Sequence, residues 1–297
     1  MKRVKIDDRS AADIDRIVTK LHRDIGNQTG PVDLAAVRTI LRLDLRYYQS
    51  SDSGLVREVL HKLTMGAKQV VHRPMLLLDA VRTFNLRALI LPDRKQILLD
   101  KDQPALKLRW HEAHEVAHGF IPWHPAYALG DDRRTLSPQC QETIEAEANW
   151  GAGRLLFPNA TFAAMSRDSP PSIQLVSRLA KHFGNTITTT LWRFVEQSDR
   201  AMFGIVGEHP HHPRDGEPVV AHFVESDRFS KEFQEISDEF LVAAVKSYCS
   251  YKKSGPLGRG TVELADTNGG RRTFMLESFS NSYQCLTLGL ELQVGGA

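Results

Sequence analysis

The chain has 297 residues, a formal net charge of +2, 41% hydrophobic residues and 25% charged residues. This length favours two folded units, or one large unit with an appendage, and excludes a single small module. The composition is that of a folded globular protein, which excludes a wholly disordered or fibrous chain. The nearly balanced charge provides no long-range field that would hold nucleic acid or an anionic membrane.

The sequence predicts a cytoplasmic protein with no membrane contact. The basic amino terminus is not followed by the apolar stretch of a signal peptide. The longest apolar runs, such as 75–78 and 88–91, are far shorter than the ~18 residues that a membrane helix needs. Three cysteines, Cys140, Cys249 and Cys285, are odd in number and widely separated. That usage is typical of a reducing compartment rather than of a disulfide framework.

The first half of the chain predicts helices around one β-hairpin. Apolar spacing predicts a first helix, capped by Ser10 and ending near Gly26, and a second helix that opens at 31–34. Strands are predicted at 43–47, 87–91 and 96–99. Turn residues between 87–91 and 96–99 join these two strands as a hairpin. Further helices are expected at three places: 55–85, near 106–120 and near 141–157.

The second half predicts a linker, two short helices and a small α+β domain. The paired prolines within 168–171 stop a helix and stiffen the segment after them. Two short helices then bracket Gly184 with a helix-turn-helix rhythm. A helix over 229–240 and three alternating stretches come next, at 261–265, 273–278 and 285–292. The predicted domains are therefore 1–170, 171–200 and 201–297.

The chemistry is expected in the helix near 106–120, which contains His114-Glu115-x-x-His118. Residues four apart on a helix point the same way, so both imidazoles can hold one cation while Glu115 acts on a water beside it. On a helical wheel the two histidines lie at the border of an apolar arc, where a dry, shaped site can form. The alternative is an accidental match on a solvated helix face.

A catalytic zinc site takes three protein ligands and leaves one position for water, so a third ligand is needed. We predict Glu145, because it interrupts the apolar stripe of the helix near 141–157 and would be buried there. Glu147 falls on the opposite side with Arg154, where a solvated charge is expected. The alternative for Glu145 is a buried ion pair with an arginine such as Arg109.

Three further residues have possible supporting roles. His124 follows His114 at the spacing of the extended H-E-x-x-H-x-x-G-x-x-H motif, but Ile121 replaces the glycine that lets the chain turn back. We therefore rank His124 below Glu145, as a residue that lies behind a ligand or contacts the substrate. His111, one turn before His114, is expected to be a neighbour. Cys140 is either an ordinary small residue before a helix or a thiolate that caps the metal in a latent enzyme.

These motifs resemble those of the ImmA/IrrE family of metallopeptidases over about residues 10–196. The similarity rests on the helix motif around 109–118 and on the segment 145–149 that runs into 155–158, preceded by 31–34 and the hairpin. The resemblance implies Zn²⁺ bound by His114, His118 and Glu145, with Glu115 as catalytic base. It also implies an α+β fold: a zincin-like metallopeptidase domain, a helix-turn-helix-like segment and a small GAF-like carboxy-terminal domain.

The resemblance further implies an intracellular protease that cleaves a helix-turn-helix transcriptional repressor in a stress, mobile-element or phage-defence response. Single-stranded DNA is a candidate for the activating signal of such proteins. The alternative is a non-catalytic, DNA-responsive regulator in which the zinc site is structural or vestigial. An intact motif glutamate favours the enzyme, because a purely structural zinc site has no use for Glu115.

Overall fold

The computed structural model describes residues 6–48, 88–91, 95–124, 138–214 and 216–292. The backbone divides into two compact units. The N-terminal unit runs to Asn159 and includes Phe183–Asn185, and the C-terminal unit contains Ala160–His182 and the chain from Thr186 onward. The structure is a mixture of helix and sheet, as the predicted α+β class requires. Among the described helices, none is long and apolar enough to cross a membrane.

The boundary between the units lies earlier than residue 170, and 171–200 is not a separate body. Phe162 in helix α8 (Asn159–Arg167) is fully buried, with the guanidinium of Arg193 6.0 Å from the centre of its ring. Helices α9 (Ile173–Phe183) and α10 (Ile187–Glu196) bracket Gly184, whose φ of +64° suits a glycine, as the sequence predicts. These helices fall mainly in the C-terminal unit. The description of these helices as a helix-turn-helix-like segment stays a prediction.

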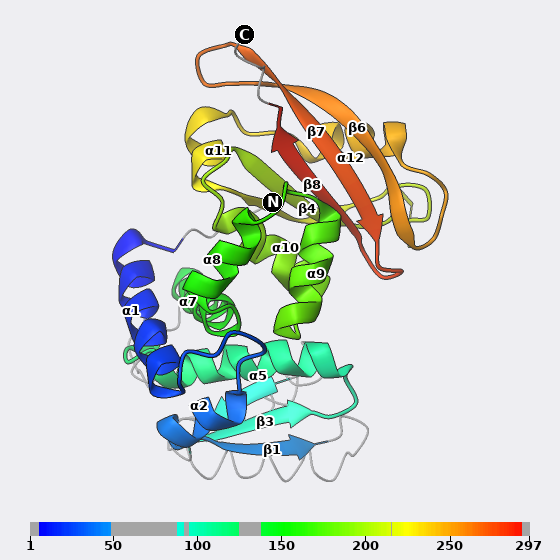
Figure 1. Ribbon diagram of the computed structural model, residues 1–297. Coiled ribbons are helices and arrows are strands. Elements are labelled where there is room, and N and C mark those ends of the chain that lie inside the picture. Colours follow the sequence, from blue (N-terminus) through cyan, green and yellow to red (C-terminus); the bar gives the residue numbers. More distant parts are fainter. Residues whose placement is uncertain (1–5, 49–87, 92–94, 125–137, 215, 293–297) are drawn as a thin grey trace. The chain divides into compact units, whose positions relative to one another are not determined.

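The N-terminal unit has a small sheet on which one long helix lies (Figure 1). Its helices and strands are α1 (Asp8–Asp24), α2 (Leu34–Leu41), β1 (Asp44–Tyr48), β2 (Ala88–Leu91), β3 (Gln96–Asp100), α5 (Ala105–Phe120) and α7 (Pro138–Leu156). The order in the sheet is β1-β3-β2, with β3 parallel to β1 and antiparallel to β2. The β2–β3 pairing confirms the predicted hairpin, whereas 55–85 lies outside the described residues.

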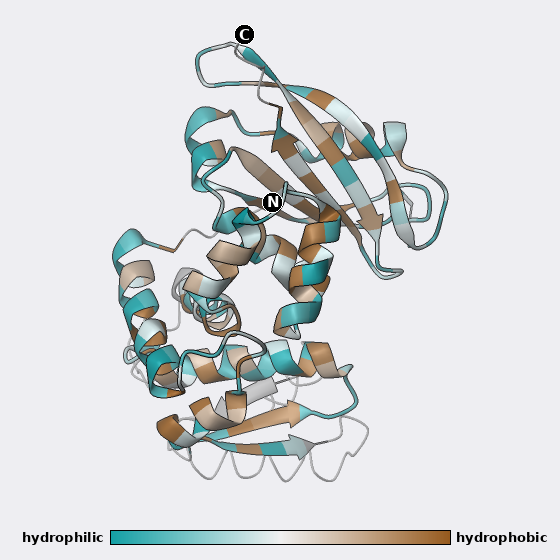
Figure 2. Ribbon diagram, in the orientation of Figure 1, coloured by the Kyte–Doolittle hydropathy of each residue, from teal (hydrophilic) through white to brown (hydrophobic). Residues whose placement is uncertain are grey.

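Burial explains this arrangement. The central strand β3 is hydrophobic over most of its length and buries Ile97, Leu98 and Leu99 (Figure 2). Helix α5 packs against β2, β3 and α7, and α1 packs against α7. The cap predicted for α1 is wrong: Asp7, not Ser10, accepts hydrogen bonds from the backbone N–H groups of residues 9 and 10.

The C-terminal unit contains an antiparallel five-stranded sheet in the order β5-β4-β8-β7-β6. Its strands are β4 (Met202–Gly207), β5 (Val220–Glu225), β6 (Gly255–Ala265), β7 (Arg271–Ser280) and β8 (Cys285–Glu291). The last three contain the predicted alternating stretches. Strand β4 was not predicted from the sequence, because every residue of β4 is buried and the strand shows no alternation.

The single helix predicted over 229–240 is wrong. The structure has two helices there, α11 (Asp227–Glu232) and α12 (Asp238–Tyr248). Phe233 is extended and pairs with Asp266, and Ser237 starts α12 by accepting a hydrogen bond from Phe240 N. The break lets Phe233 stack on Phe229 within the aromatic core of this unit.

Candidate metal centre

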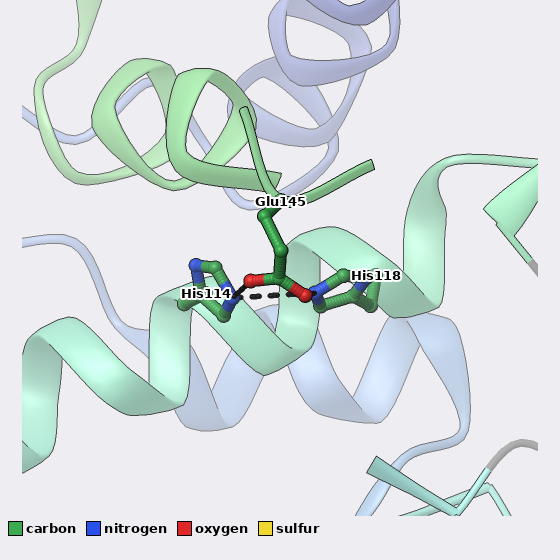
Figure 3. A group of neighbouring side chains, drawn as sticks. All are labelled: His114, His118 and Glu145. Carbon is green, nitrogen blue, oxygen red and sulfur yellow. Dashed lines mark hydrogen bonds and ion pairs between the residues drawn. The ribbon is translucent and has the colours of Figure 1, made fainter. Parts of the chain in front are cut away.

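Helices α5 and α7 bring three predicted site residues together within the N-terminal unit. His114 and His118 lie one helical turn apart on α5, and Glu145 of α7 reaches between their imidazoles (Figure 3). Helix α5 fully buries Ala113, Val116 and Ala117, whereas both histidines are only partly buried. This confirms the predicted position of the histidines at the border of the apolar arc.

The donor atoms of the three side chains point at one another. His114 Nε2 lies 3.2 Å from Glu145 Oε2 and 3.2 Å from His118 Nε2. His118 Nε2 lies 3.6 Å from Glu145 Oε1. In a tetrahedral zinc site with bonds of about 2.0–2.1 Å, ligand atoms lie about 3.3 Å apart. The His-His-Glu set therefore fits zinc in both chemistry and spacing.

The prediction that Glu145 is buried is wrong, because its side chain is 50% exposed. Glu145 precedes the first residue of the buried stripe formed by Ala148, Ala152 and Leu155 on α7. Its carboxylate therefore lies at the solvent-exposed end of that stripe. The alternative prediction, a buried ion pair between Glu145 and Arg109, is also wrong. Arg109 donates instead to Asn185 Oδ1 and to the carbonyl of Val32. The partly exposed carboxylate of Glu145 instead faces the two histidines.

The charges of the three groups depend on one another. Burial lowers the pKa of His114, but the hydrogen bond to Glu145 and the charge of Glu115 outweigh it and leave that pKa raised. Burial and the charge of His114 lower the pKa of His118 to about 3. Burial raises the pKa of Glu145, whereas the hydrogen bond and charge of His114 bring it below its usual range. At neutral pH His118 is therefore neutral and Glu145 ionised, which are the forms that bind a cation, whereas the raised pKa of His114 favours a proton that must leave before its Nε2 can bind one.

The outer ring nitrogens of both histidines meet further polar groups. His114 Nδ1 lies 3.0 Å from Asn149 Oδ1, one turn after Glu145 on α7. His118 Nδ1 lies 2.9 Å from His124 Nδ1. Asn149 has no role in the sequence-based prediction. Its spacing of four residues from Glu145, which places both side chains on one face of α7, was the signal that could have found it.

His124 reaches His118 because the chain turns immediately after α5. Ile121 ends the helix in an extended conformation, and His124 N–H donates to the carbonyl of Ile121 at 3.2 Å. The turn brings His124 to the outer nitrogen of His118, not to the nitrogen that faces Glu145. Among the described residues, the cluster that could hold a metal ion contains His114, His118 and Glu145 without His124.

The prediction that Glu147 is solvated is wrong. Its side chain is 5% exposed and accepts hydrogen bonds from His124 Nε2 at 3.0 Å and from Trp123 Nε1 at 2.6 Å. The opposite side of α7 meets the turn after α5 rather than water. The helical wheel describes one helix alone and therefore could not show this contact.

The other predicted site residues lie around this cluster or outside it. Glu115 is 7% exposed, and its charge acts on His114. His111 is partly buried one turn before His114 and lies outside the three-residue cluster. Cys140 falls in the first turn of α7, but its side chain is outside the described residues. A capping role for Cys140 stays a prediction.

Gly151 allows α5 and α7 to approach closely. A Cβ atom at Gly151 would lie 3.1 Å from Ala117 Cβ and 3.1 Å from Phe120 Cζ, whereas at Gly153 on the same helix it would meet nothing within 4 Å. We expect Gly153→Ala to stabilise the protein by about 1 kcal/mol through helix propensity. Gly151→Ala should be less favourable than Gly153→Ala by at least about 1 kcal/mol, because its methyl group crowds the helix contact.

Urea unfolding of the metal-free variants measures this difference. Equal stabilisation by both alanines would mean that the packing of α5 on α7 has room for the added methyl group. Zinc affinity should fall in Gly151→Ala and stay unchanged in Gly153→Ala, since only the first moves Glu145 relative to the histidines.

A family comparison agrees with this arrangement. Residues 70–194 match the family model of the IrrE N-terminal-like domain, Peptidase_M78. This match identifies residues 70–194 as a domain of the ImmA/IrrE type. The matched range contains α5, α7 and the three converging side chains. The match supports a peptidase-type domain over residues 70–194 and confirms the resemblance seen in the sequence. No protein of curated function matches the chain.

Eleven solved chains are structurally similar to this chain. One is a Mycobacterium tuberculosis transcriptional regulator, with a TM-score of 0.54 and 12% sequence identity. The similarity covers 98% of this chain and 95% of that chain. At this identity it shows a shared fold alone.

Proposed function

We propose that the protein is a zinc-dependent endopeptidase, with zinc held by His114, His118 and Glu145. The observation that carries the proposal is the convergence of three donor atoms from two helices, at tetrahedral spacing, beside the motif glutamate. Zinc, when bound, supplies the Lewis acidity that lowers the pKa of a water and polarises a peptide carbonyl.

Glu115 acts as the general base and then as the general acid. It follows His114 directly on α5 and is nearly buried, so water screens its charge only weakly from a reacting group. Its carboxylate takes a proton from the attacking water as the new C–O bond forms. It then gives that proton to the amine nitrogen as the peptide C–N bond breaks.

The sheet offers a place for an extended substrate. Among the described strands, β2 lies at an edge of the β1-β3-β2 sheet, and α5 packs against β2. A peptide that adds to this edge would be recognised through its main chain, with side-chain pockets supplying specificity. Strand β3 is central in this sheet, so among the described residues β2 presents the free edge of the hairpin.

The substrate that we propose is a helix-turn-helix transcriptional repressor in the cytoplasm. The family resemblance supports this choice, and the name of the similar solved structure, a transcriptional regulator, places that protein in gene regulation. The C-terminal unit is the proposed sensor-like part, and single-stranded DNA is the proposed candidate signal. The alternative is a non-catalytic, DNA-responsive regulator, with which the name transcriptional regulator of that similar structure is equally compatible.

Incubation with purified candidate repressors encoded beside the gene tests the proposal. Zinc-loaded protein should cut one of them at a defined bond, identified by mass spectrometry of the fragments. The wild-type protein stripped of metal by a chelator should not cut, and zinc should restore cleavage. Transcriptional control that persists in a variant unable to cleave would support the regulator instead.

A further inference from the structure

The Nδ1 atoms of the candidate zinc ligands His114 and His118 have different hydrogen-bond partners. His114 meets a neutral amide, Asn149, that lies in the same helix as Glu145. His118 meets His124, which in turn meets Glu147, so three side chains form a line that ends on a carboxylate. Trp123 contacts the same oxygen of that carboxylate. Proposed catalysis through Glu115 uses none of these outer groups.

Only one placement of hydrogen atoms satisfies the whole line when zinc is bound. His118 must offer a lone pair from Nε2 to the metal, so its proton lies on Nδ1 and is donated to His124 Nδ1. His124 then accepts at Nδ1, and its own proton lies on Nε2, where Glu147 accepts it. Each contact has one donor and one acceptor, and no group in the line is left unsatisfied.

The burial of Glu147 couples the line of His118, His124 and Glu147 electrostatically to a bound cation. A buried carboxylate is costly unless it is paired, and among the described residues no lysine or arginine forms an ion pair with Glu147. Its carboxylate accepts from the ring N–H groups of Trp123 and His124. A cation bound at His118 Nε2 would polarise the imidazoles of His118 and His124. Their polarised N–H groups would then stabilise the negative charge of Glu147.

We propose that His124 and Glu147 are positioning residues that fix the tautomer and ring orientation of His118 for zinc. The inference rests on the proposed metal function and goes beyond it by assigning an outer partner to this ligand. Glu147 orients His124 and strengthens it as an acceptor, and His124 in turn makes His118 a better zinc ligand. Trp123 also donates to this carboxylate, but it lies outside the line that leads to the metal.

Zinc affinity, measured by competition with a chromophoric chelator, tests this inference without any substrate. Glu147→Gln keeps the side-chain volume and removes the charge, and His124→Phe breaks the line. Each should weaken zinc binding by about 10–100-fold. The matched control is Trp123→Phe, which removes one donor to Glu147 and leaves the line intact, so its affinity should stay within about threefold of wild type.

Cobalt substitution provides a readout that a general packing defect would not move. The visible spectrum of bound Co²⁺ should shift in Glu147→Gln, whose apo form should unfold at the urea concentration of wild type, and stay unchanged in Trp123→Phe. Wild-type zinc affinity in both Glu147→Gln and His124→Phe would overturn the positioning role and leave the proposed peptidase intact. Absence of zinc binding in the wild-type protein would overturn both proposals together.

Discussion

Replacing Glu115 by glutamine is expected to leave zinc binding unchanged and to lower the rate of peptide cleavage by about 10²–10⁴-fold. The change removes the carboxylate that accepts and returns the proton, but it keeps the side-chain volume in a nearly buried position. None of the three converging donor atoms belongs to Glu115. Single-turnover cleavage of an identified substrate and the zinc content of the purified variant give the two readouts.

The matched control is Glu239→Gln, an equivalent change at an exposed position in α12. Its cleavage rate and zinc content should equal those of wild type. If Glu115→Gln cuts as fast as wild type, the motif glutamate has no catalytic role and another base must be sought. If Glu115→Gln loses its zinc, its effect on cleavage is indirect, and the assigned role is wrong.

The second large effect is expected from removing one of the converging side chains. Glu145→Ala or His118→Ala leaves only two protein donors, so zinc affinity should fall by more than the about 10–100-fold that loss of an outer partner costs. Cleavage at limiting zinc should disappear. Chelator competition on the apo protein measures this directly.

His182→Ala is the control for this series, because His182 is an exposed histidine of α9 in the C-terminal unit. It should keep the zinc affinity of wild type. A Glu145→Ala protein that binds zinc as tightly as wild type would exclude Glu145 as a ligand. The third donor would then have to come from elsewhere in the chain.

The candidate centre could be predicted from sequence as far as single helices determine it. The spacing of His114 and His118, and the apolar arc beside them, are properties of α5 alone, so the helical wheel placed them correctly. The side chain of Glu145 also lies on the predicted face of α7, toward the histidines. Its exposure was misjudged, because the wheel shows which way a side chain points but not where the neighbouring helix ends.

The parts that failed depend on contacts between segments. Glu147 is buried because the turn after α5 folds over the far side of α7, and no periodicity in α7 records that turn. Strand β4 is covered on both faces, which removes the alternation by which strands are recognised. The helix break at Phe233 followed from a cap at Ser237, a signal present in the sequence but outweighed by the apolar spacing on either side.

The central claim is that one zinc ion joins α5 to α7. The most direct measurement is a crystal of the zinc-loaded protein with diffraction data collected on both sides of the zinc absorption edge. We predict one anomalous peak in the N-terminal unit at about 2.0–2.2 Å from His114 Nε2, His118 Nε2 and a carboxylate oxygen of Glu145. A zinc-soaked crystal with no peak there, or with its peak on other side chains, would contradict this claim.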